Sequence, residues 1–314
     1  SRMQERPIKI LVDALSTLGA SISYTKNEGY PPLLIEGNTL TKNSIHMKAN
    51  VSSQYISALL LISPILENGL TLHLEGKITS TPYIKMTLSL LNDLGVQTSF
   101  ENNTIIVFPF HEFAPKTFVV ESDWSSASYF YSIVALSPVG TQIAISEYKS
   151  TSLQGDAIIQ EIYKNLGIES IFNGTTLTLK KIGNQLPKCL SLDLSNAPDI
   201  AQTIAVTCLG LKMDCDITGL HTLKIKETDR LVALQNEIKK LGTTIEITQN
   251  SLHLKTPSDL NSGVVLSTYN DHRMAMAFAP LALKTQLFVD DAEVVSKSYP
   301  DFWNDLKTLG FTIV

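Results

Sequence analysis

Two kinds of hydrophobic segment alternate along the 314-residue chain. The first kind is amphipathic, with apolar residues three or four positions apart, and every copy ends in a Leu-Gly pair. This spacing predicts a helix with one buried face, and a glycine just past a helix end readily adopts the left-handed conformation of a C-cap. The five predicted helices span residues 8–18, 83–94, 157–166, 231–241 and 301–309, and they end at Gly19, Gly95, Gly167, Gly242 and Gly310.

The second kind of segment is apolar nearly all round, which predicts a helix that is buried on most of its sides. Its four copies cover residues 52–63, 125–137, 198–209 and 270–279, and they stop at Pro64, Pro138, Gly210 and Pro280. These residues interrupt a helix. Each copy is followed by an alternating stretch typical of a strand, at residues 70–76, 141–147, 215–220 and 287–292.

Together these segments form an internal repeat of strand, buried helix, strand, amphipathic helix, strand and strand, in which the last two strands flank a polar turn. This order predicts an α/β fold. The chain opens at Arg6-Pro7, directly before an amphipathic helix that has no buried helix of its own ahead of it. We therefore expect the chain to begin within a repeat unit, as an N-terminally truncated piece of a longer protein.

The repeat also predicts two domains, with a boundary near Val120-Glu121. Residues 1–120 would hold one complete unit and the tail of another, as the remainder of a first domain. Residues 121–314 would form a second domain of three complete units. The chain is 44% hydrophobic, which is enough to bury two cores.

Composition excludes several classes of protein. No apolar run approaches the roughly 18 residues of a membrane helix, and the N-terminus lacks the profile of a signal peptide. Three cysteines without CxxC spacing, together with the lack of a signal peptide, favour the cytoplasm. A net charge of -5 with no basic run argues against nucleic acid as a partner.

Cations occur at two predicted helix starts, where the positive end of the helix dipole disfavours them. The segment Lys226-Glu227-Thr228-Asp229-Arg230 is expected to open an amphipathic helix with two cations four residues apart on one face, and such like charges repel. Arg273 is expected in the first turn of a buried helix. An anionic ligand between the cations and the helix ends would explain both placements. A solvated helix start is the simpler explanation for one helix, but two matching positions of a repeat favour an anion site.

Serines mark two further helix starts. Ser52-Ser53-Gln54 combines good N-cap residues with an amide, so a capping role and contact with a phosphate are equally supported. For Ser125-Ser126 the capping role is the favoured interpretation.

Three charged residues have two interpretations each. Asp199, after Pro198, fits an N-cap, but its place among the repeated helix starts makes it a candidate general base. Glu227 lies between two cations that could tune its acidity, so it is either a first-turn charge or a proton shuttle. Lys297 is either a surface lysine or a further anion ligand.

No pair of histidines has the spacing of metal ligands, so we predict no metal site. The sequence contains no GxGxxG, GxxxxGK[ST] or GxSxG motif, which removes support for a nucleotide cradle or a serine hydrolase. No cofactor is predicted.

Four motifs together are specific enough to indicate a family. They are Glu5-Arg6-Pro7-Ile8, Ser52-Ser53-Gln54, the Lys226–Arg230 segment and the run from Tyr269 to Met276 (YNDHRMAM), in that order. The whole chain resembles the enolpyruvyl transferases, and within them the 5-enolpyruvylshikimate-3-phosphate (EPSP) synthase family. The related cell-wall enzyme, UDP-N-acetylglucosamine enolpyruvyl transferase, usually carries a reactive cysteine in its early half, whereas the first cysteine here is Cys189.

The resemblance implies a reaction and a fold. The enolpyruvyl group of phosphoenolpyruvate would pass to the 5-hydroxyl of shikimate 3-phosphate and phosphate would be released, in the pathway to chorismate and aromatic amino acids. Each of two domains would be an inside-out barrel of three βαβαββ units, with helices inside and sheets outside. A full-length parent would be a monomer, whereas the incomplete first domain would expose apolar surface and favour self-association.

The resemblance also implies roles for the motif residues. Shikimate 3-phosphate would be held by Ser52, Ser53, Gln54, Ser80, Tyr83, Asp199 and Lys226. Phosphoenolpyruvate would be bound by Arg6, Gln54, Arg230, Arg273 and Lys297. Asp199 would take the proton of the attacking hydroxyl, and Glu227 would handle protons at the methylene carbon. Thr222 stands where some members have an asparagine, and we assign it no role.

Two departures from the family pattern affect the expected activity. The family's early Lys-Ser…Arg segment and its Asn-Ala-Gly-Thr loop are not in this sequence, so we expect weak substrate binding and no turnover from the truncated chain. A substrate-binding but non-catalytic domain is the alternative. An RNA 3'-phosphate cyclase on a related repeat fold would need a nucleotide-linked histidine and a basic face, and neither is evident.

Overall fold

The computed structural model describes residues 2–49, 52–76, 78–256 and 259–314, and it divides into two compact units. Unit 1 comprises residues 1–119 and unit 2 comprises residues 120–314. Each unit buries its own hydrophobic core. The division falls beside the Val120-Glu121 pair at which the repeat pattern placed a boundary.

Unit 1 combines a two-stranded and a four-stranded sheet with three α-helices among its described residues. Its elements, in order, are α1 (Lys9–Leu18), β1 (Ser21–Tyr24), β2 (Leu33–Glu36), β3 (Ser44–Lys48), α2 (Ser53–Ile62), β4 (Leu70–Glu75), α3 (Thr81–Asp93), β5 (Thr98–Glu101) and β6 (Thr104–Val107). The larger sheet has the order β3-β4-β6-β5.

Unit 2 holds the remaining elements, together with short 3-10 helices that include η3 (Gly155–Ile158), η4 (Pro198–Ile200), η5 (His221–Ile225) and η7 (Ala292–Lys297). Its helices are α4 (Trp124–Leu136), α5 (Ile159–Lys164), α6 (Ala201–Gly210), α7 (Arg230–Lys240), α8 (His272–Phe278) and α9 (Phe302–Thr308). Its strands are β7 (Gln142–Ile145), β8 (Ile168–Asn173), β9 (Thr176–Lys181), β10 (Cys189–Asp193), β11 (Asp214–Thr218), β12 (Ile245–Ile247), β13 (Leu252–Leu254), β14 (Val264–Leu266) and β15 (Leu287–Val289).

The repeat is visible in the strand order of the sheets. The sheet β10-β11-β13-β12 has the same order, and the same parallel and antiparallel pairs, as the sheet β3-β4-β6-β5 of unit 1. We expected three complete units after residue 121, but among the described residues of unit 2 only the stretch from β10 to β13 shows all six elements. The stretch before α4 forms no strand, and residues 309–314, which follow α9, form none either.

This topology determines where several helices begin. A helix that joins two parallel strands has to run back against them, so it starts at their carboxyl edge. Helix α6 joins the parallel strands β10 and β11, and α7 joins β11 to β12, which run parallel because both are antiparallel to β13. The first turns of α6 and α7 therefore lie at the same edge of one sheet. Helix α8 joins the parallel strands β14 and β15 in the same way.

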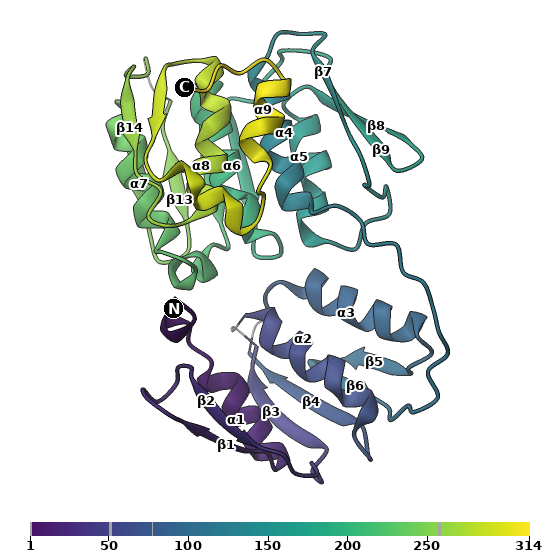
Figure 1. Cartoon of the computed structure of the whole chain (residues 1–314). Coiled ribbons are helices and arrows are strands. Elements are labelled where there is room, and N and C mark those ends of the chain that lie inside the picture. The colour runs from purple at the N-terminus through teal and green to yellow at the C-terminus, as the bar shows by residue number, and fades with distance from the viewer. Residues whose placement is uncertain (1, 50–51, 77, 257–258) are drawn as a thin grey trace. The chain divides into compact units, whose positions relative to one another are not determined.

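The buried helices of unit 2 pack against one another. Helix α4 contacts α6, and α6 contacts α8. Figure 1 shows the three side by side, between strands β7 to β9 and strands β13 and β14. Every residue of α6 is buried, and so are all residues of α4 except Ser126. In unit 1, α2 differs from the prediction of burial on most sides, because Leu61 at its end is 59% exposed.

All five predicted glycine caps have positive φ, between 77° and 112°. Gly167 shows why no other residue fits there. A Cβ at this position would lie 2.3 Å from the carbonyl oxygen of Gly183, which is closer than two such atoms can approach. None of the helices that the structure describes has the length and apolar character needed to span a bilayer.

Candidate active site

Arg230, the first residue of α7, lies at the centre of a cluster of charges in unit 2. Its side chain is only 2% exposed and contacts three carboxylates. Nε donates to Asp271 at 2.7 Å, Nη1 to Asp199 at 2.9 Å and Nη2 to Glu227 at 2.7 Å. A guanidinium whose donors all meet carboxylates can remain charged in the interior.

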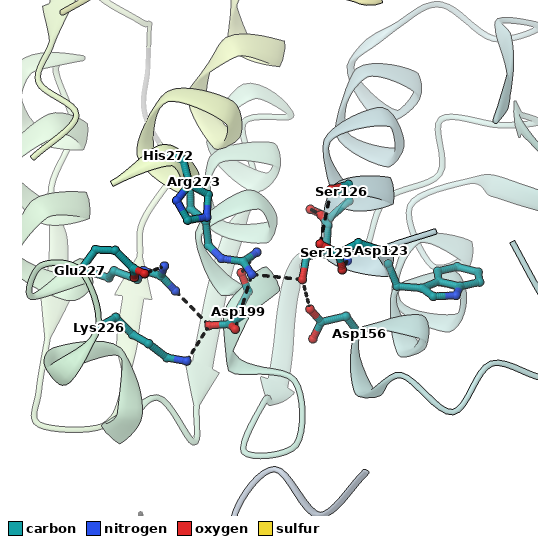
Figure 2. A network of polar contacts seen from close by, with 12 residues as sticks. Asp123, Ser125, Ser126, Asp156, Asp199, Lys226, Glu227, His272 and Arg273 are labelled. Atoms are coloured by element: carbon teal, nitrogen blue, oxygen red, sulfur yellow. Dashed lines mark hydrogen bonds and ion pairs between the residues drawn. The ribbon is translucent and has the colours of Figure 1, made fainter. Parts of the chain in front are cut away.

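Asp199 brings three cations together. Besides Arg230, it lies 3.3 Å from Nζ of Lys226 and 3.5 Å from Nη2 of Arg273. Figure 2 shows Lys226 and Arg273 approaching this carboxylate from opposite sides. The cations therefore share one location rather than pointing to separate patches of solvent, as an anion site requires.

Asp271 fixes both arginines. It is the N-cap of α8, where its carboxylate accepts from the backbone N–H of Arg273 at 2.9 Å, and it also accepts from Arg230. The preceding residues Tyr269 and Asn270 have φ of 54° and 56°, a left-handed region that non-glycine residues rarely occupy. Lys297 donates to the carbonyl oxygen of Asn270 at 3.0 Å, which places its ammonium next to this turn.

A second group of contacts joins Arg273 to α4. Its Nη2 donates to Oγ of Ser125 at 3.2 Å, and that hydroxyl donates to Oδ2 of Asp156 in η3. Asp156 is fully buried. Ser125 and Asp156 lie on the side of Arg273 that faces away from Lys226 (Figure 2).

Asp199 and Asp156 differ in acidity. Burial alone would raise the pKa of Asp199, but the charges of Arg273, Lys226 and Arg230 outweigh it and bring the pKa well below its ordinary value. Burial raises the pKa of Asp156 to about 6, and the negative charge of Asp199 adds to the effect. Asp199 is thus ionised at neutral pH, and it becomes a stronger base if anions draw the cations away from it.

Two local predictions were wrong, and one of the two interpretations of Asp199 was wrong as well. Lys226 lies outside the helix, which starts at Arg230 with Asp229 as N-cap, so the two cations do not share a helix face. Asp199 makes no capping bond, because its carboxylate faces the cations instead. Helix α4 is capped by Asp123, which accepts from the backbone N–H of Ser125 at 2.9 Å, rather than by Ser125-Ser126.

Unit 1 contains the other predicted site residues. Ser52 caps α2, accepting from the backbone N–H of Gln54 at 3.4 Å, and Ser53 is the first residue of that helix. Tyr55 donates to the carbonyl of Pro7, which ties the Arg6-Pro7 segment to the first turn of α2.

Ser80 and Tyr83 lie at the start of α3, where Ser80 has a φ of 53°. A 2.8 Å hydrogen bond between Ser57 and Thr87 holds α2 and α3 side by side. Both helices run back from parallel strands, so their first turns lie at the same edge of the sheet.

Sequence reasoning missed Asp271, Ser125 and Asp156. Asp271 had a recognisable signal, because an aspartate before His272-Arg273 fits an N-cap. Asp156 had no such signal, since its partner Ser125 lies 31 positions away in the sequence.

Thr222, to which no role was assigned, is buried, and its hydroxyl has no hydrogen-bond partner in the described structure. Among the described residues, no group of three or more His, Cys, Asp or Glu has an arrangement that could hold a metal ion.

Comparison with known proteins identifies the family. Residues 1–306 match the family described as EPSP synthase (3-phosphoshikimate 1-carboxyvinyltransferase). The chain belongs to the EPSP synthase family. It is 47% identical over 315 positions to the 3-phosphoshikimate 1-carboxyvinyltransferase of Bacteroides fragilis strain YCH46, an alignment that covers 99% of this chain and 76% of the relative. The enzyme of the same name from Shewanella pealeana is 34% identical, over 98% of this chain and 72% of the relative.

Solved structures agree with this EPSP synthase assignment at the level of the fold. EPSP synthase from Acinetobacter baumannii matches with a TM-score of 0.77 at 21% identity, over 99% of this chain and 72% of that one. The enolpyruvyl transferase NikO from Streptomyces tendae matches with a TM-score of 0.73 at 15% identity, over 97% and 71% of the two chains. The mixed α/β fold is therefore that of the enolpyruvyl transferases.

Proposed function

We propose that this member of the EPSP synthase family binds shikimate 3-phosphate and phosphoenolpyruvate, and that its residues serve the transfer of the enolpyruvyl group to the 5-hydroxyl with release of phosphate. The observation that carries the proposal is the meeting of Lys226, Arg230 and Arg273 at Asp199. Both substrates are anions, and they would compete with Asp199 for these cations.

The two reacting protons are assigned to two carboxylates. Asp199 takes the proton of the 5-hydroxyl as its oxygen attacks, since anionic substrates that engage the cations raise the basicity of this carboxylate. Glu227, 2.7 Å from Arg230, gives a proton to the methylene carbon and removes one from it as phosphate leaves. The cations stabilise the phosphate as it departs.

The remaining assignments follow the family pattern. Ser52, Ser53, Gln54, Ser80, Tyr83 and Lys226 contact shikimate 3-phosphate, and Arg6, Gln54, Arg230, Arg273 and Lys297 contact phosphoenolpyruvate. The relatives described above are named 3-phosphoshikimate 1-carboxyvinyltransferase, which favours shikimate 3-phosphate over a UDP-amino sugar as the acceptor. The proposal includes an inside-out barrel of three units for residues 121–314, the remainder of a first such domain for residues 1–120, and action in the cytoplasm.

Calorimetry with shikimate 3-phosphate, followed by phosphoenolpyruvate, tests the binding, and an assay of phosphate release tests the turnover. Asp199→Asn separates the two, because it removes the negative charge that Lys226, Arg230 and Arg273 share and also removes the base. We expect it to bind phosphoenolpyruvate at least as tightly as the unchanged chain, and to lower any phosphate release by about 10²- to 10⁴-fold. If neither substrate binds the unchanged chain at millimolar concentration, the proposed function is wrong for this chain.

A further inference from the structure

Asp156 is a fully buried carboxyl group that no predicted motif contained. One oxygen accepts the hydroxyl proton of Ser125, and Oδ1 has no hydrogen-bond partner in the described structure. An unpaired buried oxygen destabilises a fold, so most buried polar groups are paired. Its surroundings therefore point to a role other than stability.

Ser125 connects this carboxyl to the site. Its hydroxyl has a single proton, which goes to Asp156, so only its lone pairs are left to face Arg273. The 3.2 Å contact of the Arg273 guanidinium with Ser125 is shorter than its contacts with Asp199, which measure 3.4 Å to the main-chain carbonyl oxygen and 3.5 Å to the carboxylate. The direction of the Ser125 hydroxyl thus decides whether Arg273 finds an acceptor there.

We propose that Asp156 is a positioning residue, which acts through the Ser125 hydroxyl to hold the guanidinium of Arg273 in place for the carboxylate or phosphate of phosphoenolpyruvate. This inference rests on the proposed function, in which Arg273 binds that substrate. Ser125 is the second residue of α4, Asp199 precedes α6 and Arg273 lies in the first turn of α8. The contacts therefore bring the starts of three equivalent buried helices of the repeat to one guanidinium.

The charge of Asp156 also bears on anion binding. The three cations of the cluster are matched by three other carboxylates, those of Asp199, Glu227 and Asp271. An ionised Asp156 adds a fourth negative charge, and it faces Asp199, Arg273 and Asp123 as its charged neighbours. Its pKa of about 6 means that it ionises just below neutral pH. An anionic substrate is therefore bound less well once Asp156 has lost its proton.

The first test needs no substrate. Nitrogen NMR of the Arg273 guanidinium, assigned with Arg273→Lys, reports whether rotation about its terminal bonds is restrained. We expect restrained signals in the unchanged chain and in Asp156→Asn, whose amide oxygen still accepts from Ser125. We expect free rotation in Ser125→Ala and in Asp156→Ala. Ser126→Ala is the control, because this neighbouring hydroxyl lies 3.4 Å from Asp123 and outside the path to Arg273.

The second test is the affinity for phosphoenolpyruvate with shikimate 3-phosphate present. Ser125→Ala and Asp156→Ala should each weaken it about tenfold, the loss of roughly one hydrogen bond to a charged group. The double variant should bind phosphoenolpyruvate no more weakly than either single variant, because both substitutions act through the same contact.

The effect of the charge of Asp156 is tested by measuring the affinity for phosphoenolpyruvate at several pH values. Because a substrate phosphate itself titrates near pH 6, the affinity of Asp156→Asn is divided by that of the unchanged chain at each pH. This ratio should rise severalfold from about one unit below to about one unit above the pKa.

The outcomes distinguish a failure of the role proposed for Asp156 from a failure of the proposed function. Unchanged Arg273 signals in Ser125→Ala and Asp156→Ala would overturn the inference, whatever the affinities are. Additive losses in the double variant, or melting temperatures that fall while affinity stays constant, would do the same. If the unchanged chain binds no phosphoenolpyruvate, the proposed function fails, and the NMR result still decides whether Asp156 positions Arg273.

Discussion

Arg230 and Asp271 form the most deeply buried ion pair among the described residues. Their atoms lie 2.7 Å apart, and the side chains are 2% and 0% exposed. The pair joins the first residue of α7 to the N-cap of α8, which are 41 positions apart in the chain. It therefore holds together two helix starts that both contribute cations to the site.

Breaking this pair should be costly, because a buried charge loses its partner. We expect Asp271→Ala to lower the free energy of unfolding by about 3–5 kcal/mol, measured by urea denaturation. The control is Asp259→Ala, which removes an equally charged residue whose side chain is 89% exposed and pairs with Lys212. Its unfolding midpoint should not change. Equal effects of the two variants would show that burial does not determine the strength of the Arg230–Asp271 pair.

Lys224 in η5 and Lys226, which directly follows η5, provide a matched test of substrate binding. Lys226 and Lys224 are 27% and 28% exposed, but Lys226 faces Asp199 whereas Lys224 faces Asp229 and Gln249. Lys226→Met should weaken the binding of shikimate 3-phosphate by about 10- to 100-fold, the loss of one charge-assisted hydrogen bond. Lys224→Met should leave the affinity unchanged. Calorimetry on both variants decides the matter, and a similar loss in each would count against a specific role of Lys226.

The raised pKa of Asp156 predicts that the stability of the fold depends on pH in an unusual way. The unfolded chain loses this proton near the ordinary pKa of 3.8, whereas the folded chain keeps it up to about 6. Between these values the folded state binds more protons, so the contribution of Asp156 to stability falls as the pH rises, by about 3 kcal/mol in all. Asp156→Asn should therefore be more stable than the unchanged chain at neutral pH, and no more stable near pH 3.

Urea denaturation at a series of pH values measures this difference. The gain from Asp156→Asn should appear between about pH 4 and pH 6 and then remain constant. A gain that is the same at every pH would mean that Asp156 has the same pKa in the folded and unfolded states, so that burial does not raise it.

Lys181 is a buried lysine with a structural role at two helix ends. Its side chain is 1% exposed, and Nζ donates to the carbonyl oxygens of Ala135 at 2.9 Å and Leu166 at 3.1 Å. Lys181→Met leaves both carbonyls without this donor and should lower the free energy of unfolding by about 1–3 kcal/mol. Lys180→Met, on the other face of β9, is the control and should melt as the unchanged chain does. A Lys181→Met variant as stable as the control would show that neither carbonyl depends on the ammonium.

The sequence by itself determined the repeat, the helix ends and the identity of the cations. These features depend on residues close together in the chain, so periodicity and the conformational freedom of glycine were sufficient to predict them. Gly19 and Gly310 have the left-handed conformation that the Leu-Gly pairs predicted.

Only the tertiary structure decided which groups neutralise those cations. The Lys226–Arg230 segment predicted like charges on one helix face, yet Lys226 lies before the helix and both residues meet Asp199, which comes from another element. Arg273 and Ser125 are 148 positions apart, and a hydrogen bond to Ser125 connects Asp156 to Arg273. Such contacts depend on how the buried helices α4, α6 and α8 pack, and the packing of distant segments leaves no periodic signal in the sequence.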